Sequence, residues 1–322
     1  MYSRIAGTGR YLPTKVLTNA DLEKMVDTTD EWIRTRTGIQ RRHIASAEET
    51  TSFMATEAAR RAMEMAGVGP NDVDFIAVGT TTPDVVFPNV ATLVQANLGI
   101  HDTPAFSLET ACSGFVYALG IADKFVRAGD AKCALVIGSE CITRLVDWSD
   151  RGTCVLFGDG AGAVILKPSE EPGILTTIMS ADGQYRDLLT FPYGISHGFD
   201  KLRSGAPAAI QMKGNEVFKV AVNTLSRLVD QTLDKAGIDR SAIDWLIPHQ
   251  ANLRIIQAAA KKLELPMKQV VVTVQDHGNT SAASIPLALD TAVRDGRIRR
   301  GQTLLLETFG GGFTWGSALV RY

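Results

Sequence analysis

The 322-residue sequence is short of cysteine, of net charge and of long apolar runs. No run of 18 apolar residues occurs, and the first residues are not apolar, so we predict neither a transmembrane helix nor a secretory leader. A net charge of −2 provides no general attraction for nucleic acid or for an anionic membrane. We therefore expect a cytoplasmic protein whose partner-binding charges are local.

Only four cysteines are present, at positions 112, 133, 141 and 154, and none forms a Cys-x-x-Cys pair. In a reducing compartment this spacing predicts neither a disulfide framework nor a zinc site. One cysteine is therefore available as a nucleophile. Hydrophobic residues make up 45% of the chain and charged residues 21%, as in ordinary globular proteins.

Helical and strand-like patterns alternate along the chain, which predicts an α/β protein with a largely buried sheet. A segment rich in Gly, Pro, Ser and Asp at 181–206 predicts a long functional loop. The expected helices cover 55–66, 89–98, 113–128 and 215–236, and the expected strands cover 74–79, 105–110, 133–138 and a stretch after the glycine turn at 158–162.

A faint internal repeat is visible. Residues 73–79 resemble 243–249, and residues 126–129 resemble 293–296. Such self-similarity predicts two related halves. Open α/β sheets place their sites at the carboxyl ends of strands, so two similar halves would bring those ends together across a pseudo-two-fold axis.

The repeat draws attention to three polar residues. Cys112 and Asn279 each lie 14 residues before a matched valine, and His249 ends a predicted strand. Cys112 follows a strand and opens a helix, where the helix dipole and free N–H groups favour a thiolate. The alternatives are a buried structural cysteine, a core or capping histidine and an ordinary helix N-cap asparagine.

Gly310-Gly-Gly312 follows a predicted strand, and its backbone can approach a ligand closely. A backbone N–H there would complete an oxyanion hole with the N–H of Cys112, although a hairpin turn also explains the triplet. The glycines at 158–162 lack the Lys-Ser/Thr of a Walker motif and precede a strand, so they predict no nucleotide site.

The ordered set of motifs resembles the β-ketoacyl-acyl-carrier-protein synthase III family of the thiolase superfamily. The set comprises Cys112, the phrases His249-Gln-Ala-Asn252 and Gly278-Asn-Thr-Ser-Ala-Ala283, and the glycine-rich segment Phe309-Gly-Gly-Gly-Phe313. The resemblance runs nearly end to end. It implies a duplicated, five-layered α-β-α-β-α fold with halves at 1–172 and 173–322, acting as a homodimer.

The resemblance also implies a reaction. A short acyl-CoA, expected to be acetyl-CoA, condenses with malonyl-acyl-carrier protein to give a 3-oxoacyl-acyl-carrier protein, CO2 and CoA, which initiates fatty acid biosynthesis. No metal and no cofactor is expected, because the coenzyme A thioester is a substrate.

The same resemblance assigns roles to individual residues. Cys112 becomes acylated, His249 and Asn279 support decarboxylation, and the backbones of Cys112 and Gly311 form the oxyanion hole. Residues implied to contact CoA or the acyl chain are Thr28, Trp32, Arg36, Arg151, Asn252, Phe87 and Phe309, with Phe87 reaching in from the dimer partner. Residues expected to attract the acidic carrier protein are Arg254, Lys261 and Lys262, for which a solvated helix face is the alternative.

Two positions depart from the family pattern. Ser107 stands where Asp is usual, and Glu109 stands where a small residue is common. Because residues 109 and 112 are three apart, a continuous strand would turn Glu109 away from the sulfur.

Other functions remain open on the residues alone. A related condensing enzyme of the hydroxymethylglutaryl-CoA or plant-polyketide type would share the fold, and a papain-like cysteine hydrolase would share Cys, His and Asn. The sequence lacks the Cys-Gly-Ser/Ala-Cys-Trp/Tyr phrase of the hydrolases. A non-catalytic scaffold that binds acyl-carrier protein is the third alternative.

Overall fold

The computed structural model describes residues 1–198 and 208–322, and its framework is two mixed β-sheets. The first sheet has the order β1-β7-β6-β4-β5, with strands Tyr2–Tyr11, Gly160–Ser169, Ala134–Glu140, Phe75–Gly79 and Ala105–Leu108. The second has the order β11-β12-β13-β8, with strands Trp245–Pro248, Thr303–Gly310, Thr314–Arg321 and Ile174–Ala181.

The two sheets repeat one topology. In the first, β4 and β6 are parallel, while β7 is antiparallel to β6 and β1 to β7. In the second, β11 and β12 are parallel, while β13 is antiparallel to β12 and β8 to β13. An isolated parallel bridge between Leu246 and Val270 stands where β5 stands in the first sheet. The chain is therefore duplicated, as the sequence repeat predicted.

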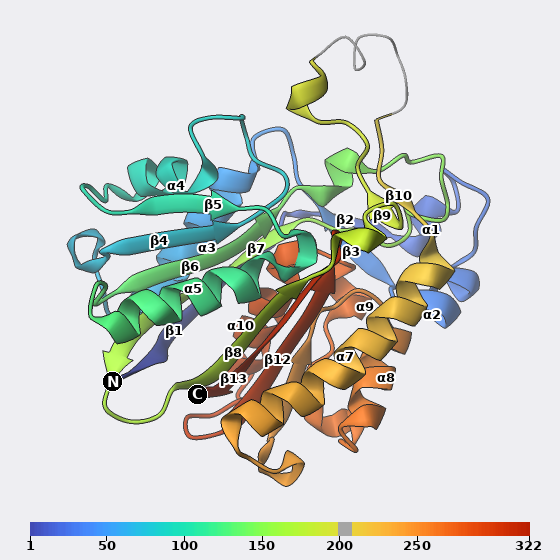
Figure 1. Cartoon of the computed structure of the whole chain (residues 1–322). Coiled ribbons are helices and arrows are strands. Elements are labelled where there is room, and N and C mark those ends of the chain that lie inside the picture. The colour runs from blue at the N-terminus through green and yellow to red at the C-terminus, as the bar shows by residue number, and fades with distance from the viewer. Residues whose placement is uncertain (199–207) are drawn as a thin grey trace.

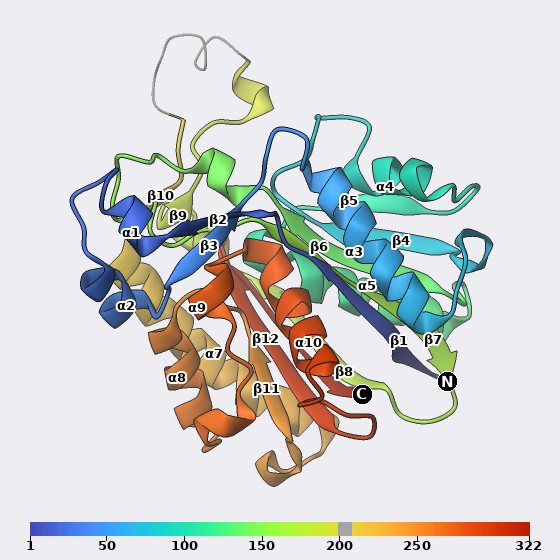
Figure 2. The same ribbon diagram turned by 180° about the vertical axis from the view of Figure 1, so that it is seen from behind.

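Helices cover both sheets and fill the space between them, which gives five layers (Figures 1 and 2). Helices α3 and α4 lie on the outer face of the first sheet, α5 and α10 lie between the sheets, and α7 and α8 cover the second sheet. Their bounds are Thr51–Ala66, Val90–Leu98, Gly114–Ala128, Ser284–Arg294, Gly214–Ala236 and Leu253–Lys262 respectively. The predicted fold class is confirmed.

Smaller helices and strand pairs lie at one end of the two sheets, where many of the loops also lie (Figure 1). They are α1 Asn19–Leu22, α2 Asp30–Thr37, α9 Val274–His277, the pair β2 Lys15–Thr18 and β3 Arg41–Ile44, and the pair β9 Leu189–Thr190 and β10 Gln211–Met212. The predicted loop at 181–206 contains β9, and its residues 199–206 lie outside the described part of the chain.

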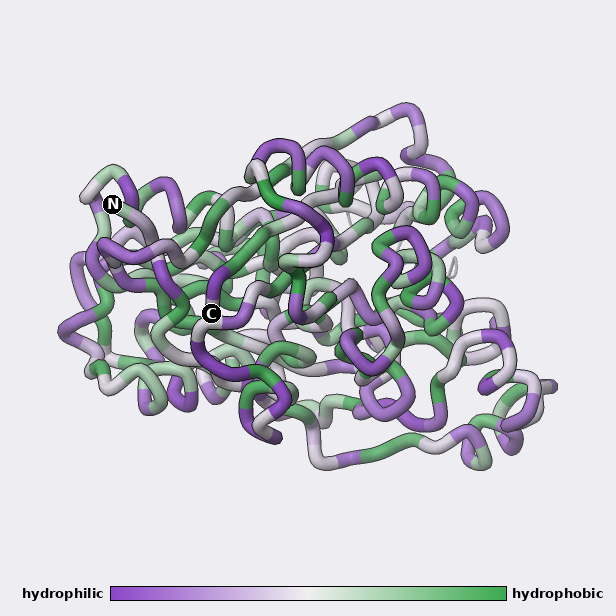
Figure 3. Tube along the Cα trace, turned by 90° about the horizontal axis from the view of Figure 1, so that it is seen from below, coloured by the Kyte–Doolittle hydropathy of each residue, from purple (hydrophilic) through white to green (hydrophobic). Residues whose placement is uncertain are grey.

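Hydrophobic residues gather inside the molecule, and hydrophilic residues predominate at its outer turns (Figure 3). Many of the buried apolar residues belong to the strands and to α5 and α10. Helix α5 shows how the pattern builds the core. Phe115, Leu119, Ala122 and Val126 recur at helical spacing and are fully buried between the sheets. Gly129 ends the helix in the left-handed conformation, with a φ of 88°.

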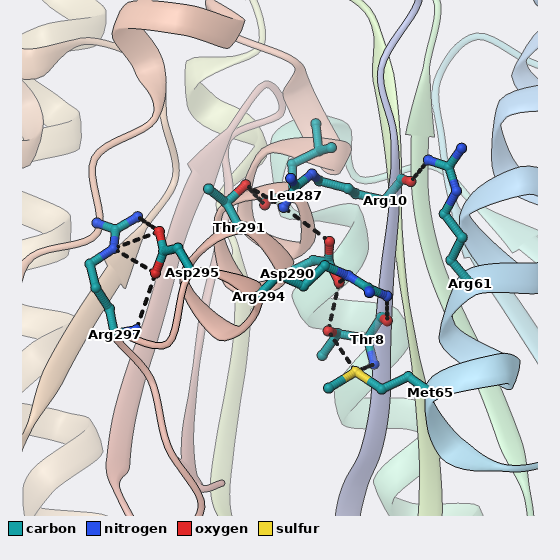
Figure 4. A network of polar contacts seen from close by, with 10 residues as sticks. All are labelled: Thr8, Arg10, Arg61, Met65, Leu287, Asp290, Thr291, Arg294, Asp295 and Arg297. Carbon is teal, nitrogen blue, oxygen red and sulfur yellow. Dashed lines mark hydrogen bonds and ion pairs between the residues drawn. The ribbon is translucent and has the colours of Figure 1, made fainter.

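A buried carboxylate joins the two halves where α10 packs on β1 (Figure 4). Asp290 accepts hydrogen bonds from the Thr8 hydroxyl at 2.7 Å, from Arg10 at 3.2 Å and from Arg294 at 2.9 Å. Arg294 also donates to the Thr8 carbonyl at 3.1 Å. Because two guanidinium groups and a hydroxyl satisfy this buried charge, the contact fixes how α10 lies against the first sheet.

The connection between the halves runs from the end of β7 at Ser169 to the start of β8 at Ile174. We propose a division at 172/173, which falls inside this connection and separates the two sheets.

The residue pairing taken from the repeat needs a correction. Equivalent 3₁₀ turns precede α5 and α10. Each turn opens with a non-glycine residue of positive φ, Ala111 at 46° and Ser281 at 50°. They are 170 positions apart (281 − 111), as are 73 and 243, so Cys112 corresponds to Ala282 and not to Asn279. The pairing taken from the repeat counted back from the valines near the helix ends. Because α10 has 11 residues and α5 has 15, equal distances from those ends do not reach equivalent positions.

Candidate active site

One cavity of about 1050 Å³ lies where strand ends of the two sheets meet. Cys112, His249 and Asn279 all line it, together with Gly310 and Gly311. Most of its remaining wall is apolar, with Ile142, Leu145, Phe157, Leu189, Ala221, Leu225, Ile255 and Phe309 among the lining residues. The three polar residues of the sequence prediction therefore share one largely apolar chamber.

A strained turn presents Cys112. The preceding Ala111 has a φ of 46°, which costs free energy in a residue with a Cβ, and α5 begins two residues after the cysteine. The Thr308 hydroxyl on β12 donates to the Cys112 carbonyl at 2.9 Å. Strand β12 of one half therefore holds the nucleophile turn of the other half.

The Cys112 thiol is protonated at neutral pH. Burial raises its pKa to about 12, hydrogen bonding with Ser281 acts in the opposite direction, and the Glu140 carboxylate raises the pKa further. Attack on a thioester requires that the thiol proton leave as the new bond forms.

His249 follows β11 and is buried, with 6% of its surface exposed. Burial lowers the pKa of its imidazole to about 3, so the ring is neutral at physiological pH. Its Nδ1 lies 2.6 Å from the Ser284 Oγ, and that Oγ accepts a hydrogen bond from the Gln250 amide at 3.3 Å. When the Ser284 hydroxyl donates to Nδ1, Nε2 carries the ring proton and is the donor.

Asn279 is oriented by its neighbours. Its side-chain Oδ1 accepts a hydrogen bond from the Ser281 amide at 2.9 Å, and its own N–H donates to the Leu156 carbonyl at 2.8 Å. Because the carbonyl end of the amide is engaged, the NH2 end is the group that can donate to a ligand in the cavity.

The glycine-rich segment packs directly against the nucleophile. A Cβ built on Gly310 would lie 2.7 Å from the Cys112 nitrogen, so this position excludes a larger residue. Gly311 lines the cavity, and a Cβ there would lie 3.6 Å from the Ala111 Cβ. The backbone of residues 310–311 thus runs beside the Cys112 N–H, as an oxyanion hole requires.

Sequence reasoning missed a fully buried acid beside these residues. Glu140 ends β6, and its carboxylate accepts from the hydroxyls of Thr80, Thr81 and Thr82 and from the Thr81 amide. It also accepts from the Ser281 hydroxyl at 3.0 Å. Glu140 occurs in an apolar strand with no motif around it, so no sequence signal separated it from a core position.

Two guanidinium groups lie close to the Trp32 ring. The Arg36 and Arg151 carbons are 4.9 and 5.2 Å from its ring centroid. Thr29, and not Thr28, caps α2 by accepting from the Trp32 amide at 3.1 Å. Thr28 precedes this cap, and its buried hydroxyl has no partner among the described residues. Trp32 and Arg36 line the cavity, whereas Thr28 and Arg151 do not.

Asn252 caps α8 by accepting from the Arg254 amide at 2.8 Å, and it donates to the Arg36 carbonyl at 3.1 Å. It therefore ties α8 to α2 while it lines the cavity. Phe309 is buried in the wall, with its ring centroid 4.6 Å from that of Phe313. Phe87 is not among the lining residues, although its neighbours Val85 and Val86 are, and 84% of its surface is exposed in the single chain.

The three basic residues expected to attract the carrier protein, Arg254, Lys261 and Lys262, differ in how freely their charges can meet a partner. Arg254 lines the cavity, and its guanidinium lies 5.1 Å from the Phe218 ring centroid. Lys261 is exposed on the same helix. The Lys262 ammonium is bound by the Asp230 carboxylate at 2.9 Å, which reduces its availability to a partner.

Glu109 requires a correction. β5 ends at Leu108, so Glu109 is not in a strand, and it lines the same cavity as Cys112. Strand alternation therefore does not apply between the two residues. The Ser107 hydroxyl accepts from the Ala91 amide at 3.2 Å at the start of α4.

Comparisons with known proteins agree with this geometry. The family models "3-Oxoacyl-[acyl-carrier-protein (ACP)] synthase III" and its C-terminal counterpart match residues 106–183 and 233–322. The β-ketoacyl-[acyl-carrier-protein] synthase III of Thioalkalivibrio sulfidiphilus is 64% identical over 321 residues, 100% of this chain and 99% of that protein. The Xanthomonas campestris relative of the same name is 63% identical over 322 residues, 100% of this chain and 99% of that protein.

The chain belongs to the β-ketoacyl-acyl-carrier-protein synthase III family. A solved 3-oxoacyl-[acyl-carrier-protein] synthase III from Aquifex aeolicus is 50% identical, with a TM-score of 0.93, and the match covers 99% of this chain and 100% of that one. The condensing-enzyme class expected from the motifs is therefore confirmed, and the chain is an acyltransferase of this type.

Two kinds of feature, membrane-spanning helices and metal-binding groups, are absent from residues 1–198 and 208–322. No helix there has the length and apolarity needed to cross a membrane. No group of three His, Cys, Asp or Glu side chains in the same ranges is arranged to hold a metal ion.

Proposed function

We propose that this chain condenses a short acyl-CoA, acetyl-CoA by preference, with malonyl-acyl-carrier protein through an acyl-Cys112 intermediate. The products are a 3-oxoacyl-acyl-carrier protein, CO2 and CoA, the first condensation of fatty acid synthesis. The observation that carries the proposal is the convergence of Cys112, His249 and Asn279 in one apolar cavity.

The first half-reaction is acyl transfer. The Cys112 sulfur attacks the thioester carbonyl, the carbonyl oxygen becomes an oxyanion, and the bond to the CoA sulfur breaks. The N–H groups of Cys112 and Gly311 are the proposed donors to the oxyanion, supported by the packing of residues 310–311 against the nucleophile turn. The thiol proton ends on the CoA sulfur, so CoA leaves as a thiol.

The second half-reaction is decarboxylation followed by attack. The bond between the malonyl methylene carbon and the carboxylate breaks, CO2 leaves, and an enolate thioester remains. A neutral His249 donating from Nε2 and the Asn279 amide are the proposed donors to the enolate oxygen. The enolate carbon then attacks the acyl carbonyl on Cys112, and the carbon–sulfur bond to the enzyme breaks. The Cys112 sulfur leaves as a thiolate and takes up one proton from solvent, which restores the thiol. The largely apolar wall of the cavity strengthens both hydrogen bonds.

Other side chains in and near the cavity are the proposed contacts to coenzyme A and to the acyl-carrier protein. Trp32 and Arg151, whose guanidinium carbon lies 5.2 Å from the indole centroid, are the proposed pair that sandwiches an adenine ring. Arg36 is the proposed phosphate contact and Asn252 the proposed pantetheine contact. Arg254 and Lys261 supply positive charge for an acidic acyl-carrier protein.

The active form is proposed to be a homodimer in the reducing cytoplasm. Val85, Val86 and Phe87 form an apolar segment with 48%, 57% and 84% of their surfaces exposed in the single chain. Such a segment favours burial against a second copy, where Phe87 would floor the partner's acyl pocket. No redox cofactor or metal is required, because the chemistry needs only a nucleophile and hydrogen-bond donors.

The half-reactions provide the test because they should fail separately. Cys112→Ala should lose acetyl transfer yet retain malonyl decarboxylation. His249→Ala and Asn279→Ala should keep acetyl transfer but lose decarboxylation by about 100-fold or more, the usual cost of one oxyanion donor. Full condensation by Asn279→Ala would remove that residue from the mechanism.

Product analysis with malonyl-acyl-carrier protein separates this function from the alternatives. A 3-oxoacyl-acyl-carrier protein is the expected product. Hydrolysis of the thioester without a new carbon–carbon bond would favour a hydrolase, and binding without any turnover would favour a scaffold.

A further inference from the structure

Glu140 is a fully buried carboxylate that contacts both halves of the chain. In the first half it accepts hydrogen bonds from the hydroxyls of Thr80, Thr81 and Thr82 and from the Thr81 amide. In the second half it accepts a hydrogen bond from the Ser281 hydroxyl at 3.0 Å. The proposed half-reactions do not use this side chain, and it does not line the cavity. Its place between the halves therefore needs another explanation.

The threonine contacts hold the carboxylate in place at the end of β6. The Thr82 hydroxyl accepts from the Cys141 amide at 2.9 Å and donates to Glu140 at 2.6 Å. The Thr80 hydroxyl accepts from the Thr82 amide at 3.1 Å, so its proton is also directed to Glu140. Burial raises the pKa of this carboxyl, whereas hydrogen bonds from the threonines and from Ser281 lower it. Both carboxylate oxygens thus have donors, which makes the group a fixed anchor for the residues it binds.

Ser281 is the residue that Glu140 holds in the second half. Its φ of 50° costs free energy in a residue with a Cβ, and such a conformation persists only where surrounding contacts hold it. The Ser281 hydroxyl donates to Glu140, and the Ser281 amide donates to the Asn279 Oδ1 at 2.9 Å. The turn at 281–283 packs on β6, the strand that carries Glu140. One residue in a strained turn therefore links the buried carboxylate to the Asn279 side chain.

We propose that Glu140 is a positioning residue that orients the Asn279 amide through Ser281. The carboxylate holds the Ser281 hydroxyl and so keeps the turn in its positive-φ conformation. The Ser281 amide then holds the Asn279 Oδ1, which leaves the NH2 end of Asn279 as the donor to the enolate oxygen. The inference rests on the proposed function, because it assigns Glu140 to the decarboxylation that Asn279 serves. Acetyl transfer, which does not use the Asn279 amide, should not depend on Glu140.

Glu140→Gln tests the anchor in the full-length protein. Glutamine keeps the side-chain length, but its amide accepts at one oxygen where the carboxylate accepts at two. We expect kcat for decarboxylation of malonyl-acyl-carrier protein to fall by about 10-fold or more, because a misplacement of about 1 Å can cost on the order of 100-fold in rate. KM should stay within about 2-fold, since the proposed binding contacts lie elsewhere. Single-turnover acetyl transfer from acetyl-CoA should also stay within about 2-fold.

A double-mutant cycle with Asn279 distinguishes positioning from a general loss of structure. If Glu140 acts only through Asn279, Glu140→Gln should cause no further loss, within about 2-fold, once Asn279→Ala has removed the amide. A structural role predicts instead that the two losses multiply and that acetyl transfer falls together with decarboxylation. Thermal unfolding of each variant checks that the compared proteins are folded.

Two substitutions at Ser281 test the link itself. Ser281→Ala deletes the hydroxyl and keeps the cost of the positive φ, so it should reproduce the loss of decarboxylation seen in Glu140→Gln. Ser281→Gly also deletes the hydroxyl, but glycine adopts a positive φ without that cost, so the turn no longer needs its anchor. Decarboxylation should therefore be faster in Ser281→Gly than in Ser281→Ala.

Asp123→Asn is the matched control for a change at a buried carboxylate. Asp123 is fully buried on α5 and accepts from the Ser3 hydroxyl at 2.8 Å and from the Lys124 ammonium at 2.7 Å. It does not line the cavity, so both half-reactions should survive the substitution.

Several outcomes would overturn the positioning role. Decarboxylation at the wild-type rate by Glu140→Gln or by Ser281→Ala would show that the Asn279 amide is oriented without this anchor. Losses that multiply in the double variant, or an equal loss of acetyl transfer, would assign Glu140 a structural role. A Ser281→Gly protein as slow as Ser281→Ala would show that Glu140 does not act by maintaining the strained turn. Decarboxylation at the wild-type rate by Asn279→Ala would instead refute the role of Asn279 in the proposed function, so the two failures are distinguishable.

Discussion

One added methyl group at Gly310 tests how closely β12 holds the nucleophile. A Cβ at Gly310 would lie 2.7 Å from the Cys112 nitrogen and 3.1 Å from its Cβ, whereas ordinary contacts begin at 3.4 Å. Gly310 has no positive φ, so alanine is compatible with its backbone and only the contact changes. The nucleophile turn must therefore shift by about 0.7 Å, the difference between 3.4 and 2.7 Å.

A misplacement of about 1 Å costs on the order of 100-fold in rate, so Gly310→Ala should slow acetyl transfer by about 10- to 100-fold. Rapid-quench acetylation measures this rate. Thermal unfolding measures the accompanying cost of overpacking, about 1–3 kcal/mol. Gly69→Ala is the matched control, because a Cβ there meets only Asp72 Oδ2 at 3.8 Å. A folded Gly310→Ala protein that acetylates at the wild-type rate would refute the close contact.

Three further expectations follow from the site. Phe87→Thr should admit longer acyl chains by removing a ring from the pocket floor, measured by acylation with a panel of acyl-CoAs; a wild type that prefers decanoyl-CoA to acetyl-CoA would contradict the role of Phe87. Arg254→Glu should weaken use of malonyl-acyl-carrier protein more at low salt than at high salt, with acetyl transfer nearly unchanged; equal damage to both would indicate a CoA contact or misfolding. Because the pKa of His249 is lowered to about 3, the ring is protonated only below that pH, and decarboxylation should show no histidine titration between about pH 5 and pH 8. A rate that changes with a midpoint near the ordinary histidine pKa of about 6.5 would contradict the neutral donor.

The alternation of strands and helices was predictable because burial follows the periodicity of apolar residues. The predicted helix at 113–128 is α5 at Gly114–Ala128, and the predicted strand at 74–79 is β4 at Phe75–Gly79. The strand predicted at 105–110 ends instead at Leu108, since the chain must turn to bring Ala111 into a positive-φ conformation. Alternation carries no signal for such a turn.

The residues that support the site were less predictable than those proposed to react. Ser284 orients His249 through a contact between residues 35 positions apart in sequence, which only the folded chain creates. Glu140 meets its threonine partners about 60 positions away in sequence. A sequence pattern can indicate a polar residue at a strand end, but it cannot show which distant hydroxyl groups will surround it.

The most direct test of the central claim is intact mass spectrometry after incubation with acetyl-CoA. The wild-type protein should gain the mass of one acetyl group, and digestion should locate it on the peptide that contains Cys112. Cys112→Ala should gain none, although it retains malonyl decarboxylation. An acetyl group on Cys112→Ala, or on any residue other than Cys112 in the wild type, would contradict the account.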